Sequence, residues 1–274
     1  MFARLFSPVL LVLLMSGPGL AGPVRELAAS LRFTELFEVL SDEGLRFGEG
    51  LEADLFPGEG GARWTREVTR IHAPAVMREM AEADLEARLE DQPEAVAKMR
   101  AFFDSPTGQR ISDLEVQARR AYLDDQVKAA AERAWGNFGV DLPGRVVLIE
   151  RLIETNDLIE QNVAGGMNAN LAFYQGMRAA GAFGEDVPDP DMMADLWSQE
   201  DAIREETASW LLPYLAMAYR PLSDAELTAY VEFSQSPEGQ LLNRALFATF
   251  DKVFAVVSRD LGTAAAGMLT GRDI

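Results

Sequence analysis

The sequence predicts an all-α fold made of two tandem helical modules that are related by internal duplication. Three observations favour this fold. Apolar residues recur at helical spacings along most of the chain, stretches that alternate apolar and polar residues are scarce, and one short phrase occurs twice. A repeat of such long period indicates a duplicated structural unit rather than one large enzyme.

The N-terminal segment has the features of an export signal. Arg4 gives it a positive start, an apolar run extends from Leu5 to Met15, and Gly19 and Ala21 suit cleavage after Ala21. The apolar run is shorter than the roughly 20 residues that span a bilayer. We therefore expect residues 1–21 to be a cleaved signal peptide and the mature protein to be periplasmic or secreted, with no membrane span. The alternative is a retained N-terminal anchor.

The first module is expected at residues 25–137. Its clearest helical stripe lies within Val76–Leu89, where charged residues fill the opposite face. The glycine-rich run Pro57–Gly61 predicts a loop. Asp91 begins a D-x-x-E pattern that is typical of a helix cap, so we expect it to cap the helix that leads into the first copy of the repeated phrase.

A second module is expected at residues 143–265. The segment Trp135–Gly144 contains several glycines and is predicted to separate the modules, with Asp141 capping the next helix. Gly181–Asp191 predicts an acidic loop. Ser223, followed three residues later by a glutamate, predicts a capping box at the start of the helix before the second copy of the phrase.

The repeated phrase has the form F-x-x-S-P-x-G-Q and predicts a sharp corner between two helices. Its serine suits a helix N-cap, its proline suits the first helical position, and its glycine lets the preceding helix come close. We expect the aromatic residue before each corner to be buried. The residues of the first corner are Phe102, Ser105, Pro106, Gly108 and Gln109, and those of the second are Phe233, Ser236, Pro237, Gly239 and Gln240.

This phrase, preceded in the second copy by Leu222–Leu227, resembles the bacterial domain-of-unknown-function 2059 family. The resemblance covers Trp210–Leu261 best, whereas the first half shares mainly the corner phrase. Members of that family are exported, all-helical modules. The resemblance therefore implies an exported helical protein, and it implies no catalytic residue, cofactor or reaction.

Composition narrows the functions further. The chain has no cysteine, 44 acidic and 25 basic residues, and a formal net charge of −19. Phosphate backbones and anionic lipid surfaces repel such a chain, so we expect no nucleic-acid partner. An exported chain without disulfides must be held together by apolar burial, for which its 48% hydrophobic residues are adequate.

No reactive constellation stands out. His72 is the single histidine, it accompanies no G-x-S-x-G nucleophile motif, and we expect it to lie at a helix end or to be partly packed. Two carboxylates are enough for a glycosidase, so composition alone leaves that route open, but no pair is singled out. We expect a non-enzyme without cofactor or metal.

The most apolar segment after the signal is Trp210–Tyr219, which contains a proline. It predicts either a buried helix at the centre of the second half or the wall of a groove. The groove residues would be Trp210, Leu211, Tyr214 and Met217. Two functions follow: a protein-interaction module of the bacterial envelope, or a carrier of an apolar small molecule or lipid between the two modules.

Overall fold

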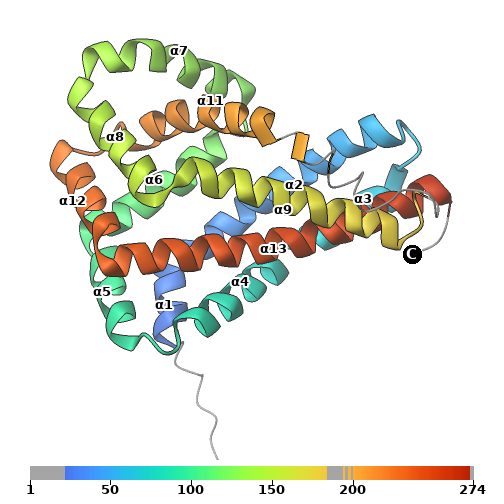
Figure 1. The fold of residues 1–274 in the computed structure, drawn as a ribbon, viewed down its shortest axis with the longest axis horizontal. Helices are drawn as coiled ribbons and strands as arrows, with labels where there is room; N and C mark the ends of the chain where they lie inside the picture. The colour runs from blue at the N-terminus through green and yellow to red at the C-terminus, as the bar shows by residue number, and fades with distance from the viewer. Residues whose placement is uncertain (1–21, 184–193, 195–196, 199, 272–274) are drawn as a thin grey trace, which may run out of the picture.

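Every regular element that the structure describes is a helix. The computed structural model describes residues 22–183, 194, 197–198 and 200–271, and no strand occurs in these ranges (Figure 1). The all-α prediction is thus confirmed. The predicted signal peptide, residues 1–21, and most of the predicted acidic loop, residues 184–191, lie outside the described residues.

The helices divide at residue 142 into an N-terminal and a C-terminal half. The N-terminal half contains α1 (Pro23–Ser30), α2 (Phe33–Leu55), α3 (Gly61–Ile71), α4 (Pro74–Leu89), α5 (Pro93–Phe103), α6 (Pro106–Ala121) and α7 (Asp125–Asp141). The C-terminal half contains α8 (Pro143–Asn156), α9 (Leu158–Ala179), α11 (Glu200–Tyr219), α12 (Asp224–Gln235) and α13 (Pro237–Thr270).

Proline and serine start many of these helices. Helices α1, α4, α5, α6, α8 and α13 all begin with a proline, which needs no backbone N–H at that position. Ser223 forms the predicted capping box, since its hydroxyl accepts from the backbone of Glu226 while the Glu226 carboxylate accepts from Ser223. The loop predicted at Pro57–Gly61 separates α2 from α3.

Two predicted helix caps are wrong. Gln92, not Asp91, is the N-cap of α5, because Pro93 occupies the first helical position. Likewise Leu142, not Asp141, precedes Pro143 at the start of α8, and neither N-cap residue makes a side-chain cap hydrogen bond.

The break predicted at Trp135–Gly144 is also misplaced. Helix α7 continues through Gly136 and Gly139 and ends only at Asp141. Both glycines lie where an added Cβ would meet no close neighbour. The two glycines therefore lower the helix propensity of this segment but do not prevent the helix from forming.

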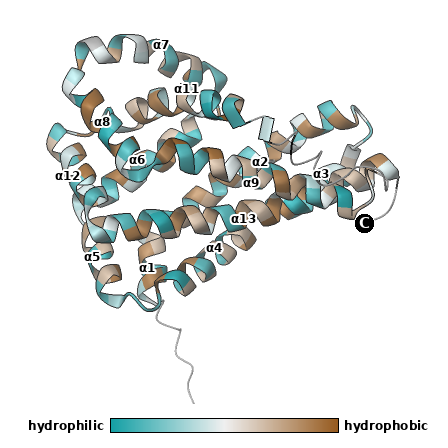
Figure 2. Ribbon diagram, in the orientation of Figure 1, coloured by the Kyte–Doolittle hydropathy of each residue, from teal (hydrophilic) through white to brown (hydrophobic). Residues whose placement is uncertain are grey.

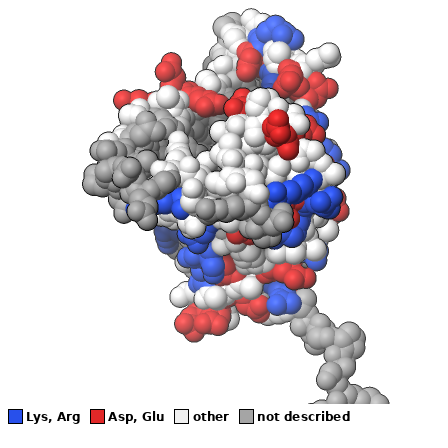
Figure 3. Space-filling view, turned by 90° about the vertical axis from the view of Figure 1, so that its right-hand side faces the viewer, with Lys and Arg blue, Asp and Glu red and all other residues white. Residues whose placement is uncertain are grey.

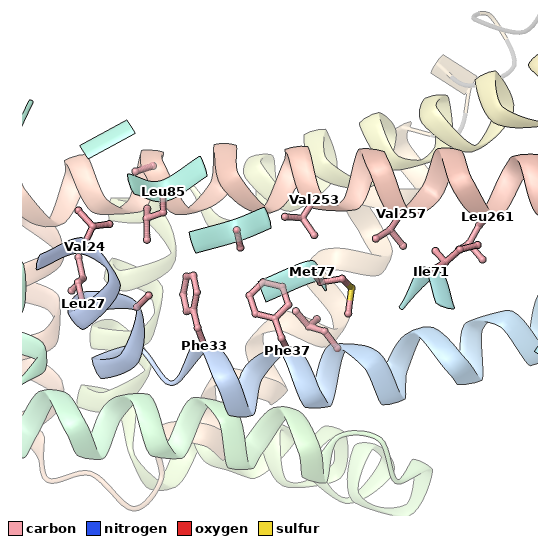
Figure 4. Packing of buried hydrophobic residues seen from close by; sticks show 14 of the residues in the cluster. Val24, Leu27, Phe33, Phe37, Ile71, Met77, Leu85, Val253, Val257 and Leu261 are labelled. Carbon is pink, nitrogen blue, oxygen red and sulfur yellow. The ribbon is translucent and has the colours of Figure 1, made fainter. Parts of the chain in front are cut away.

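The larger of the two main buried clusters, core A, combines helices α1–α5 with the long α13. Figure 4 shows Phe33 and Phe37 of α2 facing Val253 and Val257 of α13, with Met77 of α4 between them. Apolar and polar residues alternate in bands along these helices, as amphipathic packing requires (Figure 2). Core A is thus completed by the last helix of the C-terminal half.

The second main cluster, core B, takes most of its residues from the C-terminal half and is completed by helices of the N-terminal half. It combines α8, α11 and α12 of the C-terminal half with α6 and α7 of the N-terminal half. Ile111 of α6 is fully buried there beside Leu152, Leu215 and Leu227. Each core therefore draws residues from both predicted modules, and the division into modules at 25–137 and 143–265 stays a prediction.

Helices α9 and α13 lie side by side over much of their length (Figure 1). Two glycines allow this close approach. A Cβ at Gly176 would lie 2.0 Å from the carbonyl oxygen of Arg259, and a Cβ at Gly262 would lie 2.0 Å from that of Phe173. Any larger residue at either position would force the two helices apart.

A buried carboxylate ties the N-terminal half to α13. Asp84 of α4 accepts hydrogen bonds from Thr249 at 3.0 Å and from Lys252 at 2.6 Å, and it also pairs with Arg88. Burial alone would raise the pKa of Asp84, but the hydrogen bonds from Lys252, Arg88 and Thr249 outweigh it and lower that pKa. Elsewhere acidic and basic side chains are interspersed, as Figure 3 shows for one end of the molecule.

Candidate functional site

A cleft of about 330 Å³ lies between the two halves. It is lined mainly by α6, α11, α12 and α13, and α2, α5, α8 and α9 each add one or two residues. Three of the predicted groove residues, Trp210, Leu211 and Tyr214, line it. They belong to α11, which continues through Pro213. The apolar segment is thus both a helix of core B and a wall of the cleft.

Met217, the fourth predicted groove residue, lies elsewhere. It lines a second groove of about 340 Å³ between α7 and α11, together with Trp135 and Phe138. The structure therefore separates Met217 from the other three predicted groove residues.

Both helix corners have the local structure that the repeated phrase predicts. The Ser105 hydroxyl accepts from the Gly108 N–H at 3.1 Å and donates to the Phe102 carbonyl at 2.6 Å. The Ser236 hydroxyl accepts from the Gly239 N–H at 3.0 Å and donates to the Phe233 carbonyl at 2.6 Å. Pro106 and Pro237 occupy the first helical positions of α6 and α13.

The glycine and glutamine of each corner hold the preceding helix close. A Cβ at Gly108 would lie 2.2 Å from the Phe102 carbonyl oxygen, and one at Gly239 would lie 2.0 Å from that of Phe233. The Gln109 amide donates to the Phe103 carbonyl at 2.6 Å, and the Gln240 amide donates to the Ser234 carbonyl at 2.8 Å.

The two corners meet at one end of the cleft. The rings of Phe102 and Phe233 stack with centroids 4.2 Å apart and planes 9° apart. Each ring is only partly buried, so the expectation of a buried aromatic before each corner is met only in part. Phe233 and Gly239 also line the cleft, which makes the second corner part of its wall.

The wall from α6 is polar, and the wall from α13 is apolar. Ser112, Glu115 and Arg119 are spaced three and four residues apart and therefore share one face of α6. Leu242, Leu246 and Phe247 face the cleft from α13. Glu115 is the central polar group, because hydroxyl groups from two other helices converge on it.

The tyrosine hydroxyls of Tyr219 and Tyr230 donate to Glu115 Oε1 at 2.6 and 3.0 Å. Tyr214 donates to the backbone carbonyl of Glu115 at 3.2 Å. Burial raises the pKa of Glu115, and the two tyrosine hydrogen bonds offset only part of this effect. Burial also raises the pKa values of the three tyrosines, so each remains a protonated donor at neutral pH.

Arg119 lies one turn beyond Glu115 but is already paired. Its guanidinium donates to both carboxylate oxygens of Glu43 at 2.8 Å each. Burial would lower the pKa of Arg119, but the hydrogen bonds to Glu43 outweigh it and raise that pKa. This bidentate pair is electrically neutral and leaves Glu115 without a countercharge.

A second chamber of about 380 Å³ adjoins the cleft. It shares Leu36, Arg119, Asn162 and Phe247 with the cleft, and Phe250 and Phe254 of α13 continue its wall. The two spaces together form an elongated cavity that is mostly apolar. Its polar side chains include Ser112 and Glu115 in the cleft and Gln161, Asn162 and Asp251 in the chamber.

Sequence reasoning did not identify Ser112, Glu115 or the tyrosines around them. The available signal was the spacing of Ser112, Glu115 and Arg119 along a helix whose apolar stripe is weak. Tyr219 and Tyr230 are distant from Glu115 in sequence, and no local pattern links them to it.

His72, the single histidine, is a packed structural residue. It is the C-cap of α3, its Nδ1 lies 3.0 Å from the Val68 carbonyl, and a Cβ at Gly44 would collide with its ring. Burial lowers the pKa of His72. Its predicted place at a helix end is confirmed.

Within the described ranges, no cluster of three or more candidate side chains is placed to hold a metal ion, and no helix combines the length and hydropathy of a membrane span. No protein-family model, curated protein or solved structure matches the chain.

Proposed function

We propose that the protein binds an elongated apolar small molecule in the cleft between its halves and acts as a carrier without catalysis. The observation that carries this proposal is the cleft itself, where Trp210, Leu211 and Tyr214 face an apolar wall of α13. Ligand pockets are usually concave, mostly apolar and several hundred Å³ in volume, with a few polar groups that fix orientation. The cleft and its adjoining chamber have these properties.

Leu246→Trp tests the proposal because the larger ring would fill the cleft without adding charge. Leu269→Trp is the matched control, since Leu269 lies on the same helix and is exposed. The probe is Nile red, an uncharged apolar dye that fluoresces when it leaves water. We expect saturable binding to the wild type, at least about tenfold weaker binding to Leu246→Trp, and unchanged binding to Leu269→Trp.

Two results would contradict the proposal. One is the absence of saturable Nile red binding to the wild type. The other is equal binding to the wild type and to a folded Leu246→Trp variant, because the dye would then occupy another surface. Circular dichroism at 222 nm checks that both variants keep their helices.

We also propose that the halves descend from a duplicated module, as the repeated phrase predicts. Similar contacts beyond the phrase support this proposal. The Gln109 side chain donates to the Ser30 carbonyl just before α2, and the Gln240 side chain donates to the Thr155 carbonyl just before α9. Arg32 and Asp157, two residues beyond these carbonyls, both adopt the left-handed conformation, with φ of 58° and 52°.

We also propose that the protein is exported to the periplasm or to the outside of the cell. The N-terminal sequence supports it through the positive start, the apolar run and the small residues before Gly22. N-terminal sequencing of the protein purified from its host tests it. A mature chain that begins at Gly22 is expected, and a retained Met1 would contradict cleavage.

A second candidate function is binding of a partner protein at the α7–α11 groove. The small side chains of Ala130 and Ala134 line it, and Trp135, Phe138 and Met217 provide apolar contacts. Such a groove suits the apolar face of an amphipathic helix. This candidate retains the interaction-module hypothesis that the sequence favours.

Site-specific photo-cross-linking in the host envelope tests the second candidate. A photoreactive residue at Ala134 should capture one discrete partner, whereas the same residue at exposed Glu132 should not. Introducing Ala130→Glu should abolish the capture. Identical cross-linking patterns at both positions would rule out a specific groove partner.

A further inference from the structure

One hydroxyl in the cleft wall has no hydrogen-bond partner. Ser112 is only 3% exposed, and its Oγ makes no hydrogen bond to any described residue. A buried hydroxyl without a partner is destabilising, so native proteins usually satisfy it. Because Ser112 lines the cleft, a bound molecule can supply the missing bond.

Glu115 lies three residues further along the same face of α6 and offers a second hydrogen-bond acceptor for a ligand. Both tyrosine hydroxyls donate to Oε1. No hydrogen bond to Oε2 is found among the residues that the structure describes. A carboxylate has about four lone-pair sites, so Glu115 retains the capacity to accept from a ligand.

The charges around the cleft disfavour an anionic ligand. Among the described residues that line the cleft, Arg119 is the basic one, and its guanidinium already donates to both carboxylate oxygens of Glu43. An entering carboxylate or phosphate would therefore meet the Glu115 carboxylate beside a basic side chain that is already paired. A cation would instead give Glu115 the countercharge that it lacks.

We propose that the ligand of the cleft is an amphiphile with a protonated amine, which donates to Glu115 Oε2 and to Ser112 Oγ. This inference rests on the proposed function and adds the chemical class of the head group. An ammonium has three donors and no acceptor, so it matches two adjacent acceptors. Its apolar chain would extend along the α13 wall past Leu246 and Phe247 toward Phe250.

A series of probes with one chain length tests the head group. Isothermal titration calorimetry at pH 7, below the critical micelle concentrations, compares dodecylamine, dodecanol and dodecanoate. We expect dodecylamine to bind at least about tenfold more tightly than either of the other two, because hydrogen bonds between charged groups are stronger than those between neutral ones. Equal or tighter binding of dodecanoate would overturn the inference.

Variants then locate the interaction. Glu115→Gln should lower dodecylamine affinity at least about tenfold, and Ser112→Ala should lower it a few-fold. Neither should change the affinity for Nile red, which has no amine. Glu90→Gln removes an exposed carboxylate outside the cleft and should leave dodecylamine affinity unchanged. Loss of amine affinity in Glu90→Gln as large as in Glu115→Gln would mean that only net charge matters, which would contradict the site.

Nile red separates the two levels of failure. If the wild type binds neither Nile red nor any dodecyl probe, the proposed function and this inference fail together. If Nile red binds and is displaced by all three dodecyl probes equally, the cleft remains a ligand site and the head-group inference alone is wrong.

Discussion

At the scale of single residues, the carboxylates of Asp84 and Glu115 have opposite environments. Asp84 is surrounded by donors, including Lys252 and Arg88, and its pKa is lowered. Glu115 receives only neutral tyrosine hydroxyls, and its pKa is raised. The first carboxylate stabilises the fold when it is charged. The second costs stability when it is charged, which is common for groups that serve binding.

Glu115→Gln should stabilise the unliganded protein at neutral pH. Because the pKa of Glu115 is higher in the folded than in the unfolded state, the wild type loses stability as pH rises above the ordinary glutamate value of about 4.5. The variant lacks this loss. Urea unfolding between pH 4 and 8 should show that the gain in unfolding free energy of the variant over the wild type grows with pH. A gain that is equal at pH 4 and pH 8 would contradict the raised pKa.

Gly239→Ala should destabilise the protein by about 1–3 kcal/mol, because the new methyl group would overlap the Phe233 carbonyl oxygen. Gly136→Ala is the matched control, since Gly136 is an exposed residue of α7 and an added Cβ there would meet no close neighbour. That control should gain about 0.5–1 kcal/mol from helix propensity. Thermal unfolding measures both changes, and an unchanged melting temperature for Gly239→Ala would show that the corner can relax.

The residues of the cleft were only partly predictable. Trp210, Leu211 and Tyr214 could be predicted because an apolar run at helical spacing indicates one continuous surface. Whether such a surface is core or groove depends on its partners, and Met217 shows that one helix contributes to two different surfaces. The side-chain hydrogen bonds to Glu115 come from Tyr219 and Tyr230, which lie more than 100 residues away in the sequence.

At the scale of elements, local chemistry decided which helix starts could be predicted. Ser105, Ser236 and Ser223 bond to backbone groups within three residues, so their sequences suffice. The errors at Asp91 and Asp141 have one cause. A proline at the first helical position makes the residue before it the N-cap, and both aspartates stand one residue too early.

Asp84→Asn should weaken the attachment of α4 to α13 by about 1–3 kcal/mol, since it removes hydrogen bonds to charged groups that are themselves partly exposed. The pKa of Asp84 is lowered in the folded state, so its contribution is present above about pH 3.8 and is lost as pH falls. Urea unfolding measures the difference in unfolding free energy between the variant and the wild type. This difference should be smaller at pH 3.5 than at pH 7. A constant difference would assign the effect to packing alone.

At the scale of the whole molecule, helices from both halves complete each core. The sequence predicts which faces of α6 and α13 are apolar. It does not predict that α13 packs into core A and α6 into core B, because an apolar stripe fits any complementary face. All-helical architecture was therefore predictable from periodicity, whereas the pairing of helices was not.

Because each core needs helices from both halves, the protein should unfold in one cooperative transition. Trp64 is buried in core A, and Trp210 packs against core B. Two variants that each keep one of these tryptophans, with the others changed to phenylalanine, report on the cores separately. Their fluorescence midpoints in urea should coincide with each other and with circular dichroism. Two separated midpoints would show that the cores unfold independently.

The position of α13 also bears on how the protein is made. A ribosome releases α1 to α5 long before Pro237–Thr270 emerges, yet these early helices need α13 to cover Phe33 and Phe37. Apolar surface of the N-terminal half therefore stays exposed until synthesis is nearly finished. A nascent chain of this kind stays accessible to chaperones, and a premature stop before α13 would leave a fragment for proteases.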